Sequence, residues 1–184
     1  MNKHVRISIA VLGSACLLTL SGCGYEFGTT VKPAQGGSLR GTHLAVPVFY
    51  NDTFEPILDQ KVTEFIRRQF LQTDGLTLSN DVGTASLVLK GTVRSYGLQT
   101  MSFHQGSVNE QRVSLGVNVR FEDAVSHKTL WQENYTTSAD FFQTSDLSTN
   151  RSRQDLATDE ACQAMAENIV SRVLETLSAK TSAP

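Results

Sequence analysis

The chain has 184 residues with 16 basic and 18 acidic side chains, which gives a formal net charge of −2 at pH 7. It has no basic run and no bulk positive charge, so it lacks the electrostatic signature of a nucleic-acid-binding protein. Its length suits one domain with a sizeable core, and no apolar stretch beyond residue 22 is long enough for a membrane-spanning helix.

The first 22 residues have the layout of a secretory signal. A positively charged start at Lys3 leads into an apolar run over residues 7–20, and two small residues then precede Cys23. The run is shorter than the roughly 20 residues that a comfortable membrane span needs. The pattern therefore predicts a cleaved signal peptide over residues 1–22.

The arrangement around Cys23 resembles the lipobox of bacterial lipoproteins. The resemblance implies cleavage between Gly22 and Cys23 and a covalent lipid on Cys23. Several acyl chains hold a protein on a bilayer stably, whereas one holds it only marginally. The residue after the cysteine is Gly24 and not an aspartate, which in lipoproteins of enteric type implies sorting to the outer membrane. An ordinary signal peptide with an incidental cysteine is the alternative.

Cysteine usage limits the redox chemistry of the mature chain. Cys16 would leave with the signal and Cys23 would carry the lipid, so Cys162 alone remains and no internal disulfide is possible. Cys162 lies in a helical pattern among alanine and methionine residues. This context predicts a buried small hydrophobe rather than a reactive thiol.

The first elements follow a tether. Residues 23–41 are predicted to form the lipidated N-terminus and a tether, because Pro33, Gly36, Gly37 and Gly41 punctuate them without any period. A strand is predicted over 43–50, with Pro47 at an edge or a locally unpaired position, since proline donates no ladder hydrogen bond. An amphipathic helix over 57–73 follows, and Gly75 caps its end.

The middle of the chain is predicted to be β-structure. A short strand over 76–79 and a strand over 86–96 come first, with Tyr96 expected on the polar face of the sheet. Residues 97–110 are expected to form a loop. The clearest signal is strict alternation of apolar and polar side chains over 111–122, which predicts a strand with one buried and one solvated face.

A hairpin and a second helix complete the pattern. Residues 129–137 are predicted to pair back onto the preceding strand with Trp131 and Tyr135 inward. A helix is predicted over 151–177, and residues 179–184 are expected to form a flexible tail. The apolar stripe of this helix is predicted to contain Leu156, Cys162, Met165, Ile169, Val173 and Leu177.

This order of elements predicts an α+β fold. A sheet with one apolar face needs a cover, and two amphipathic helices can provide it. We expect a two-layer sandwich in which a mixed or antiparallel sheet of about four strands carries both helices on one face. The single domain is expected to span residues 42–178.

Five short motifs, in their order after the lipobox, resemble the LptE-type family of lipopolysaccharide-assembly lipoproteins. They are residues 23–27 (CGYEF), 45–49 (AVPVF), 51–56 (NDTFEP), 85–91 (ASLVLKG) and 166–170 (AENIV). The resemblance implies the same sandwich fold and a non-enzymatic role. It implies a protein that plugs the lumen of an LptD-type outer-membrane β-barrel, helps that barrel assemble, and contacts lipopolysaccharide on its way to the outer leaflet.

Five basic residues are candidate lipopolysaccharide contacts. The resemblance implies contacts near one end of the sheet, which correspond by position to His104 and Arg151. A histidine there would lose its charge as the pH rises through about 6.5. Arg94, Arg112 and Arg120 are expected on the exposed sheet face, where a guanidinium can bind phosphate bidentately. The alternative is that they are ordinary solvated charges.

Other functional classes have weaker support in the sequence. His43, His104 and His127 lie in different predicted elements without ligand spacing, so no metal and no cofactor other than the Cys23 lipid is expected. There is no nucleophile-elbow motif or glycine-rich phosphate loop, so we predict no enzyme, although catalytic groups can converge from distant positions. A pilotin-like accessory lipoprotein for another envelope machine is the alternative, because fold alone does not define function.

Overall fold

The computed structural model describes residues 41–79, 81–104 and 107–182. The signal peptide, Cys23, nearly all of the tether and the last two residues lie outside the described residues. The elements are β1 (Thr42–Ala45), β2 (Tyr50–Asn51), α2 (Leu58–Leu71), β3 (Leu76–Ser79), the short 3-10 helix η1 (Val82–Thr84), β4 (Leu87–His104), β5 (Ser107–Asp123), β6 (Thr129–Phe142) and α3 (Leu147–Ser182).

The strands form one mixed sheet, as predicted. Its order is β3-β1-β4-β5-β6, and β2 also pairs with β4, which makes six strands among the described residues. The pairs among β1, β2, β3 and β4 are parallel, whereas β4, β5 and β6 form an antiparallel meander. The expected count of about four is too low, partly because the strand predicted over 43–50 is interrupted at 46–49. Pro47 lies in this interruption, in agreement with the expected unpaired position.

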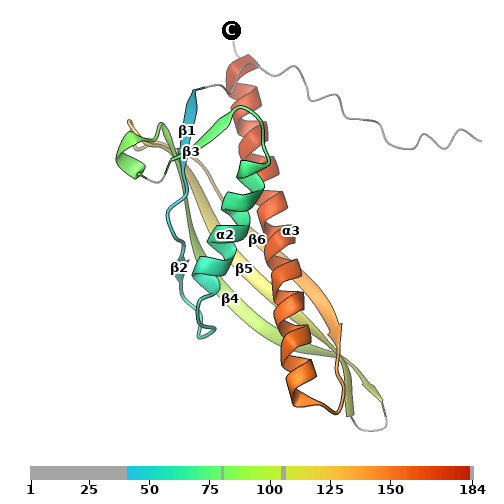
Figure 1. Cartoon of the computed structure of the whole chain (residues 1–184). Helices are drawn as coiled ribbons and strands as arrows, with labels where there is room; N and C mark the ends of the chain where they lie inside the picture. Colours follow the sequence, from blue (N-terminus) through green and yellow to red (C-terminus); the bar gives the residue numbers. More distant parts are fainter. Residues whose placement is uncertain (1–40, 80, 105–106, 183–184) are drawn as a thin grey trace, which may run out of the picture. The chain divides into compact units, whose positions relative to one another are not determined.

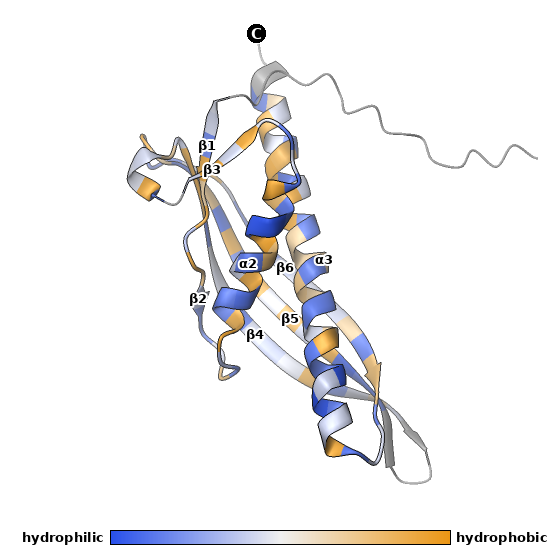
Figure 2. Cartoon of the chain, in the orientation of Figure 1, coloured by the Kyte–Doolittle hydropathy of each residue, from blue (hydrophilic) through white to orange (hydrophobic). Residues whose placement is uncertain are grey.

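Both helices cover the same face of the sheet, which confirms the predicted two-layer α+β architecture (Figure 1). The helices turn their apolar residues toward the strands, and their hydrophilic residues face outward (Figure 2). The buried side chains of α2 are Leu58, Val62, Thr63, Ile66 and Phe70. Those of α3 include Ala161, Cys162, Met165, Ile169 and Val173.

The alternation over β5 is confirmed. Its five inward residues are at most 2% exposed: Val113, Leu115, Val117, Val119 and Phe121. Trp131 packs on Phe121 from β6, with ring centroids 5.6 Å apart. The placement of Leu156 in the apolar stripe is wrong, because its side chain is 68% exposed. Leu156 lies six residues before Cys162, and six residues at 3.6 per turn place it on a different side of the helix.

The predicted loop over 97–110 is also wrong, because β4 and β5 continue as a hairpin up to the pair His104 and Ser107. The ladder register shifts between Val93 and Ser95 and again near Met101. An extra residue in one strand reverses the faces of the side chains that follow it. Tyr96 therefore faces the helices instead of the polar side, and its Oη lies 2.9 Å from Oγ1 of Thr158 on α3.

A glycine on β4 makes room for the chain between β1 and β2. Phe49 is 3% exposed, and its backbone N–H donates to Oγ1 of Thr63 at 3.0 Å. A Cβ at Gly91 would lie 2.1 Å from the Phe49 ring. Gly91 therefore allows the ring to pack directly on the strand backbone, which anchors the interrupted segment in the core.

Candidate functional site

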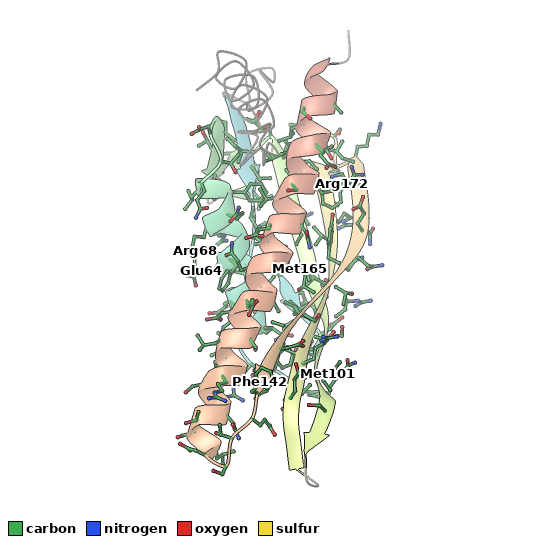
Figure 3. All side chains as sticks on the ribbon, turned by 90° about the vertical axis from the view of Figure 1, so that its right-hand side faces the viewer. Glu64, Arg68, Met101, Phe142, Met165 and Arg172 are labelled. Atoms are coloured by element: carbon green, nitrogen blue, oxygen red, sulfur yellow. The ribbon has the colours of Figure 1, made fainter. Side chains whose placement is uncertain are left out.

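The candidate site is the sheet face turned away from the helices, which we call the polar sheet face. Successive side chains of a strand alternate between faces, so β4, β5 and β6 together present one continuous polar surface. Its residues include Lys90, Thr92, Arg112, Ser114, Asn118, Arg120, Glu122, Gln132, Asn134, Ser138 and Asp140. In Figure 3, Met101 and Phe142 lie toward the end of the sheet away from Arg172.

A bidentate ion pair lies near one end of the polar sheet face. Arg112 and Asp140 are directly opposite each other on β5 and β6. Arg112 donates from Nε to Oδ1 at 2.6 Å and from Nη2 to Oδ2 at 2.7 Å. These hydrogen bonds hold the pKa of Asp140 below its ordinary value and raise the pKa of Arg112. The pair is thus fully ionised over the physiological pH range.

A three-membered charge cluster lies near the other end. The Glu122 side chain is only 8% exposed, and it accepts from Nζ of Lys90 at 2.8 Å and from Nε of Arg120 at 2.6 Å. Two cations on one buried carboxylate satisfy its oxygen atoms and leave the cluster with one surplus positive charge. This cluster is the cationic part of the polar sheet face.

Three side-chain amides lie between the two charged ends of the polar sheet face. Asn118 on β5 donates from Nδ2 to Oδ1 of Asn134 at 2.8 Å, and its own Oδ1 accepts from Nε2 of Gln132 at 3.0 Å. Such side-chain bonds across neighbouring strands order the polar groups before any partner arrives. The face therefore offers a fixed array of charged and neutral hydrogen-bonding groups.

The structure does not bring the five predicted basic residues into one site. Arg112 and Arg120 share the polar sheet face, whereas Arg94 lies at a bulge on the β4 edge, where it pairs with Asp52. Arg151 lies in the first part of α3 and pairs with Glu55 at 3.3 Å and with Asp155 at 3.5 Å. His104 ends β4, and its side chain lies outside the described part of the chain. Their role as lipopolysaccharide contacts stays a prediction.

Each of the four arginines among the predicted site residues has a carboxylate partner that the sequence reasoning did not identify. The pairing of Arg112 with Asp140 was accessible, because counting residues back from the predicted turn at 124–128 places them nearly opposite. Besides Asp155 one helical turn away from Arg151, the partners of Arg94 and Arg151 are Asp52 and Glu55, in the connection between β2 and α2. No sequence signal links residues so far apart in the chain.

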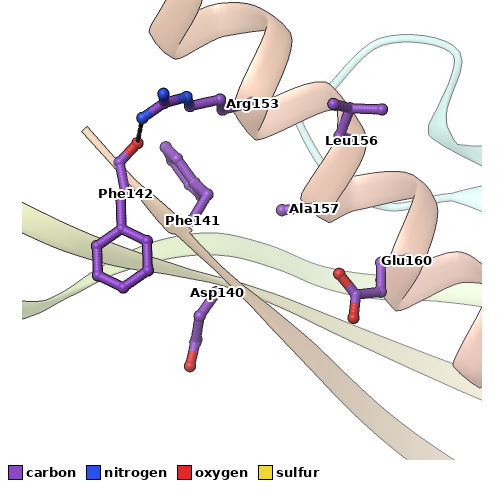
Figure 4. Close-up of a pocket in the computed structure, with 7 residues that line it drawn as sticks. All are labelled: Asp140, Phe141, Phe142, Arg153, Leu156, Ala157 and Glu160. Carbon is purple, nitrogen blue, oxygen red and sulfur yellow. Dashed lines mark hydrogen bonds between the residues drawn. The ribbon is translucent and has the colours of Figure 1, made fainter. Parts of the chain in front are cut away.

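Two hollows lie beside the sheet, one between β6 and α3 and one beside β4. The first, of about 440 Å³, is lined by Asp140, Phe141, Phe142, Arg153, Leu156, Ala157 and Glu160 (Figure 4). Arg153 donates from Nη1 to the Phe142 carbonyl oxygen at 2.7 Å. The second, of about 560 Å³, lies beside β4 and is lined by Asp52, Thr53, Phe54, Glu55, Arg94, Ser95, Tyr96, Gly97, Leu98 and Gln154.

The described residues show no metal centre, since no three of their His, Cys, Asp or Glu side chains are grouped so that they could hold an ion. None of the helices in residues 41–79, 81–104 and 107–182 combines the length and apolarity of a membrane span.

The chain is similar to known proteins in sequence and in fold. The family model described as LptE, lipopolysaccharide-assembly, matches residues 42–173. A hypothetical protein from Chlamydia trachomatis has a TM-score of 0.55 at 16% identity over 75% of this chain and 98% of its own. A protein from Xanthomonas campestris has a TM-score of 0.56 at 10% identity over 80% of this chain and 94% of its own. These identities support the fold alone. The search of curated proteins found no match.

Proposed function

The chain belongs to the LptE family of lipopolysaccharide assembly, and from that membership we propose that it is an outer-membrane lipoprotein that plugs an LptD-type β-barrel. It would help this barrel assemble and would take part in delivering lipopolysaccharide to the outer leaflet. The lipid on Cys23 would hold it at the membrane. The role would be non-enzymatic, since the proposed activity consists of binding the barrel and lipopolysaccharide.

The polar sheet face is the observation that best supports the plug role. The interior of an outer-membrane barrel is polar, so a protein seated there needs a polar surface with its own charges already satisfied. Arg112 with Asp140 meets that condition fully, and the buried Glu122 carboxylate is satisfied by its two cations, with one positive charge left over. The hydrogen bonds among the side-chain amides between these pairs add donors and acceptors in fixed positions.

Lipopolysaccharide phosphates would find arginine on the same face. A guanidinium has five N–H donors, so an arginine that already holds a carboxylate can bind a phosphate as well. The surplus positive charge beside Glu122 makes Arg120 the stronger candidate. Arg112, whose charge is balanced by Asp140, is the weaker one.

Affinity purification of the lipidated protein from mild-detergent envelope extracts tests this function. We expect a barrel of LptD type to be recovered at a one-to-one ratio with the wild-type protein, and less of it with the double variant Arg112→Gln, Arg120→Gln. The matched control is Arg68→Gln on α2, where the Arg68 side chain is 53% exposed and pairs with Glu64 one turn away. Recovery of another secretion or assembly machine in place of the barrel would overturn the proposal.

A further inference from the structure

One edge of β4 is open over its second half. β2 pairs with β4 only at Thr92 and Val93, and the backbone N–H of Asp52 donates to the Val93 carbonyl oxygen at 2.9 Å. In the described part of the chain, β4 beyond Val93 pairs only with β5. The stretch Ser95–Ser102 (SYGLQTMS) contains no charged residue and no proline. Proteins often protect an exposed edge with such residues, so between the register shifts that follow Val93 and Thr100 this edge lacks that protection against strand addition.

The second hollow lies beside this open edge. It is a shallow, open depression between residues 52–55, which follow β2, and residues 94–98 of β4. A strand that continued the line of β2 would occupy this space, but the chain turns away at Asp52. Phe54 and Leu98 give the hollow apolar walls, and Gln154 contributes a polar group from α3.

The turn that forms one wall is held rigidly. Asn51 accepts at Oδ1 from the backbone N–H of Thr53 at 2.9 Å and donates from Nδ2 to the Glu55 carbonyl oxygen at 2.9 Å. Ion pairs from Asp52 to Arg94 and from Glu55 to Arg151 fix its two sides. The turn nevertheless leaves the Phe54 side chain fully exposed. A large apolar side chain on a pre-ordered loop is typical of an anchor in a protein interface.

We propose that an extended loop segment of the barrel partner, outside the paired strands of its wall, adds as a strand to β4 along Ser95–Ser102 and packs an apolar side chain against Phe54 and Leu98. This inference rests on the proposed function. Main-chain hydrogen bonds to the open edge would provide affinity, and the hollow would select the side chain. An acyl chain would leave those backbone groups without partners. An anionic headgroup would find Arg94 and Arg151 already neutralised by Asp52 and Glu55.

A lysine placed on the open edge tests the proposal, because lysine on an edge strand opposes strand addition. The variant is Leu98→Lys in the full lipidated chain, co-expressed with the barrel and purified in mild detergent. Leu98 is 43% exposed, so the variant should keep its thermal unfolding midpoint. The control is Leu71→Lys on α2, where the leucine is 74% exposed. We expect Leu98→Lys to recover at least about tenfold less barrel than wild type, and Leu71→Lys to recover as much.

A photo-crosslinking residue at Thr100 identifies what lies on the edge. A crosslink to a barrel peptide supports the proposal, whereas a crosslink to a second copy of this chain or to lipid overturns it. If wild type recovers the barrel and Leu98→Lys recovers it equally, this inference alone is wrong. If wild type recovers no barrel, the proposed function fails and this inference fails with it. If Leu98→Lys does not fold, Thr100→Lys takes its place.

Discussion

Arg112 and Asp140 face each other across β5 and β6, with both guanidinium–carboxylate hydrogen bonds formed at 2.6 and 2.7 Å. In the sequence Arg112 reads as an unpaired cation, whereas in the fold Asp140 balances its charge. The polar sheet face is therefore less positive than the sequence alone suggests. The charges of Arg94 and Arg151 are balanced in the same way, whereas Arg120 shares the Glu122 carboxylate with Lys90, so that cluster keeps one surplus positive charge. The face is therefore better suited to specific polar contacts than to general attraction of anions.

The pair should be visible in an acid titration. The hydrogen bonds from Arg112 lower the pKa of Asp140, so their contribution to stability is present above the unfolded value of about 3.9 and is lost as pH falls through the folded value. We expect Arg112→Gln to move the pKa of Asp140 back up toward that value. An NMR titration of the Asp140 carboxyl carbon measures this. An unchanged pKa would show that the guanidinium does not set it.

The cations around Glu122 should behave non-additively. Lys90→Met or Arg120→Met alone leaves the buried carboxylate with one cation, at a cost of about 1 kcal/mol or less. Both together leave a buried charge without a counter-ion, which we expect to cost about 3 kcal/mol or more. Urea unfolding of the two single variants and the double variant measures the difference. Simple addition of the single costs would show that Glu122 does not depend on this pair.

Gly91 should tolerate no side chain. Its added Cβ would lie 2.1 Å from the Phe49 ring, so we expect Gly91→Ala to destabilise the fold by about 1–3 kcal/mol through overpacking. Phe49→Leu in the same chain should recover part of that loss, because the smaller side chain vacates the space. Denaturant midpoints of the single and double variants provide the measurement. A Gly91→Ala variant as stable as wild type would contradict this packing of the Phe49 ring.

The bulge that turns Tyr96 toward the helices can be tested through its hydroxyl. Tyr96 Oη contacts Oγ1 of Thr158 at 2.9 Å and accepts from Nε2 of Gln154 at 3.2 Å. We expect Tyr96→Phe to cost about 1 kcal/mol of unfolding free energy. Tyr50→Phe is the control, since Tyr50 is 68% exposed, and it should have no measurable effect. Equal stability of the two variants would place Tyr96 on the solvent side.

Cys162 should be chemically silent in the folded protein. Burial raises the pKa of its thiol to about 12, and the thiolate is the reactive form. Alkylation at pH 8, followed by peptide mapping, should label Cys162 only after urea unfolds the chain. Because the folded pKa exceeds the unfolded value of about 8.5, the buried thiol contributes fully to stability below that pH. This contribution should decline as the pH rises toward 12. Rapid labelling of native protein would contradict the buried position.

Local patterns in the sequence determined the class of the fold. The alternation from Val113 to Phe121 identified a strand with one buried face, and the helical spacing around Val62 and Met165 identified two covering helices. Periodicity is a property of neighbouring residues, and it is present in the chain before folding. The family was likewise accessible from short motifs, and the family model that matches residues 42–173 confirms it.

Tertiary structure decided the features that carry the function proposed here. The register shift after Val93 turned Tyr96 inward, and the end of β2 at Asn51 left the β4 edge open. Asp52 and Glu55, which pair with Arg94 and Arg151, lie in a connection some 40 to 100 residues away in the sequence. Such contacts depend on how strands align and where a chain turns away, which distant parts of the protein decide together. Sequence period alone therefore identified the cations but not the carboxylates that neutralise them.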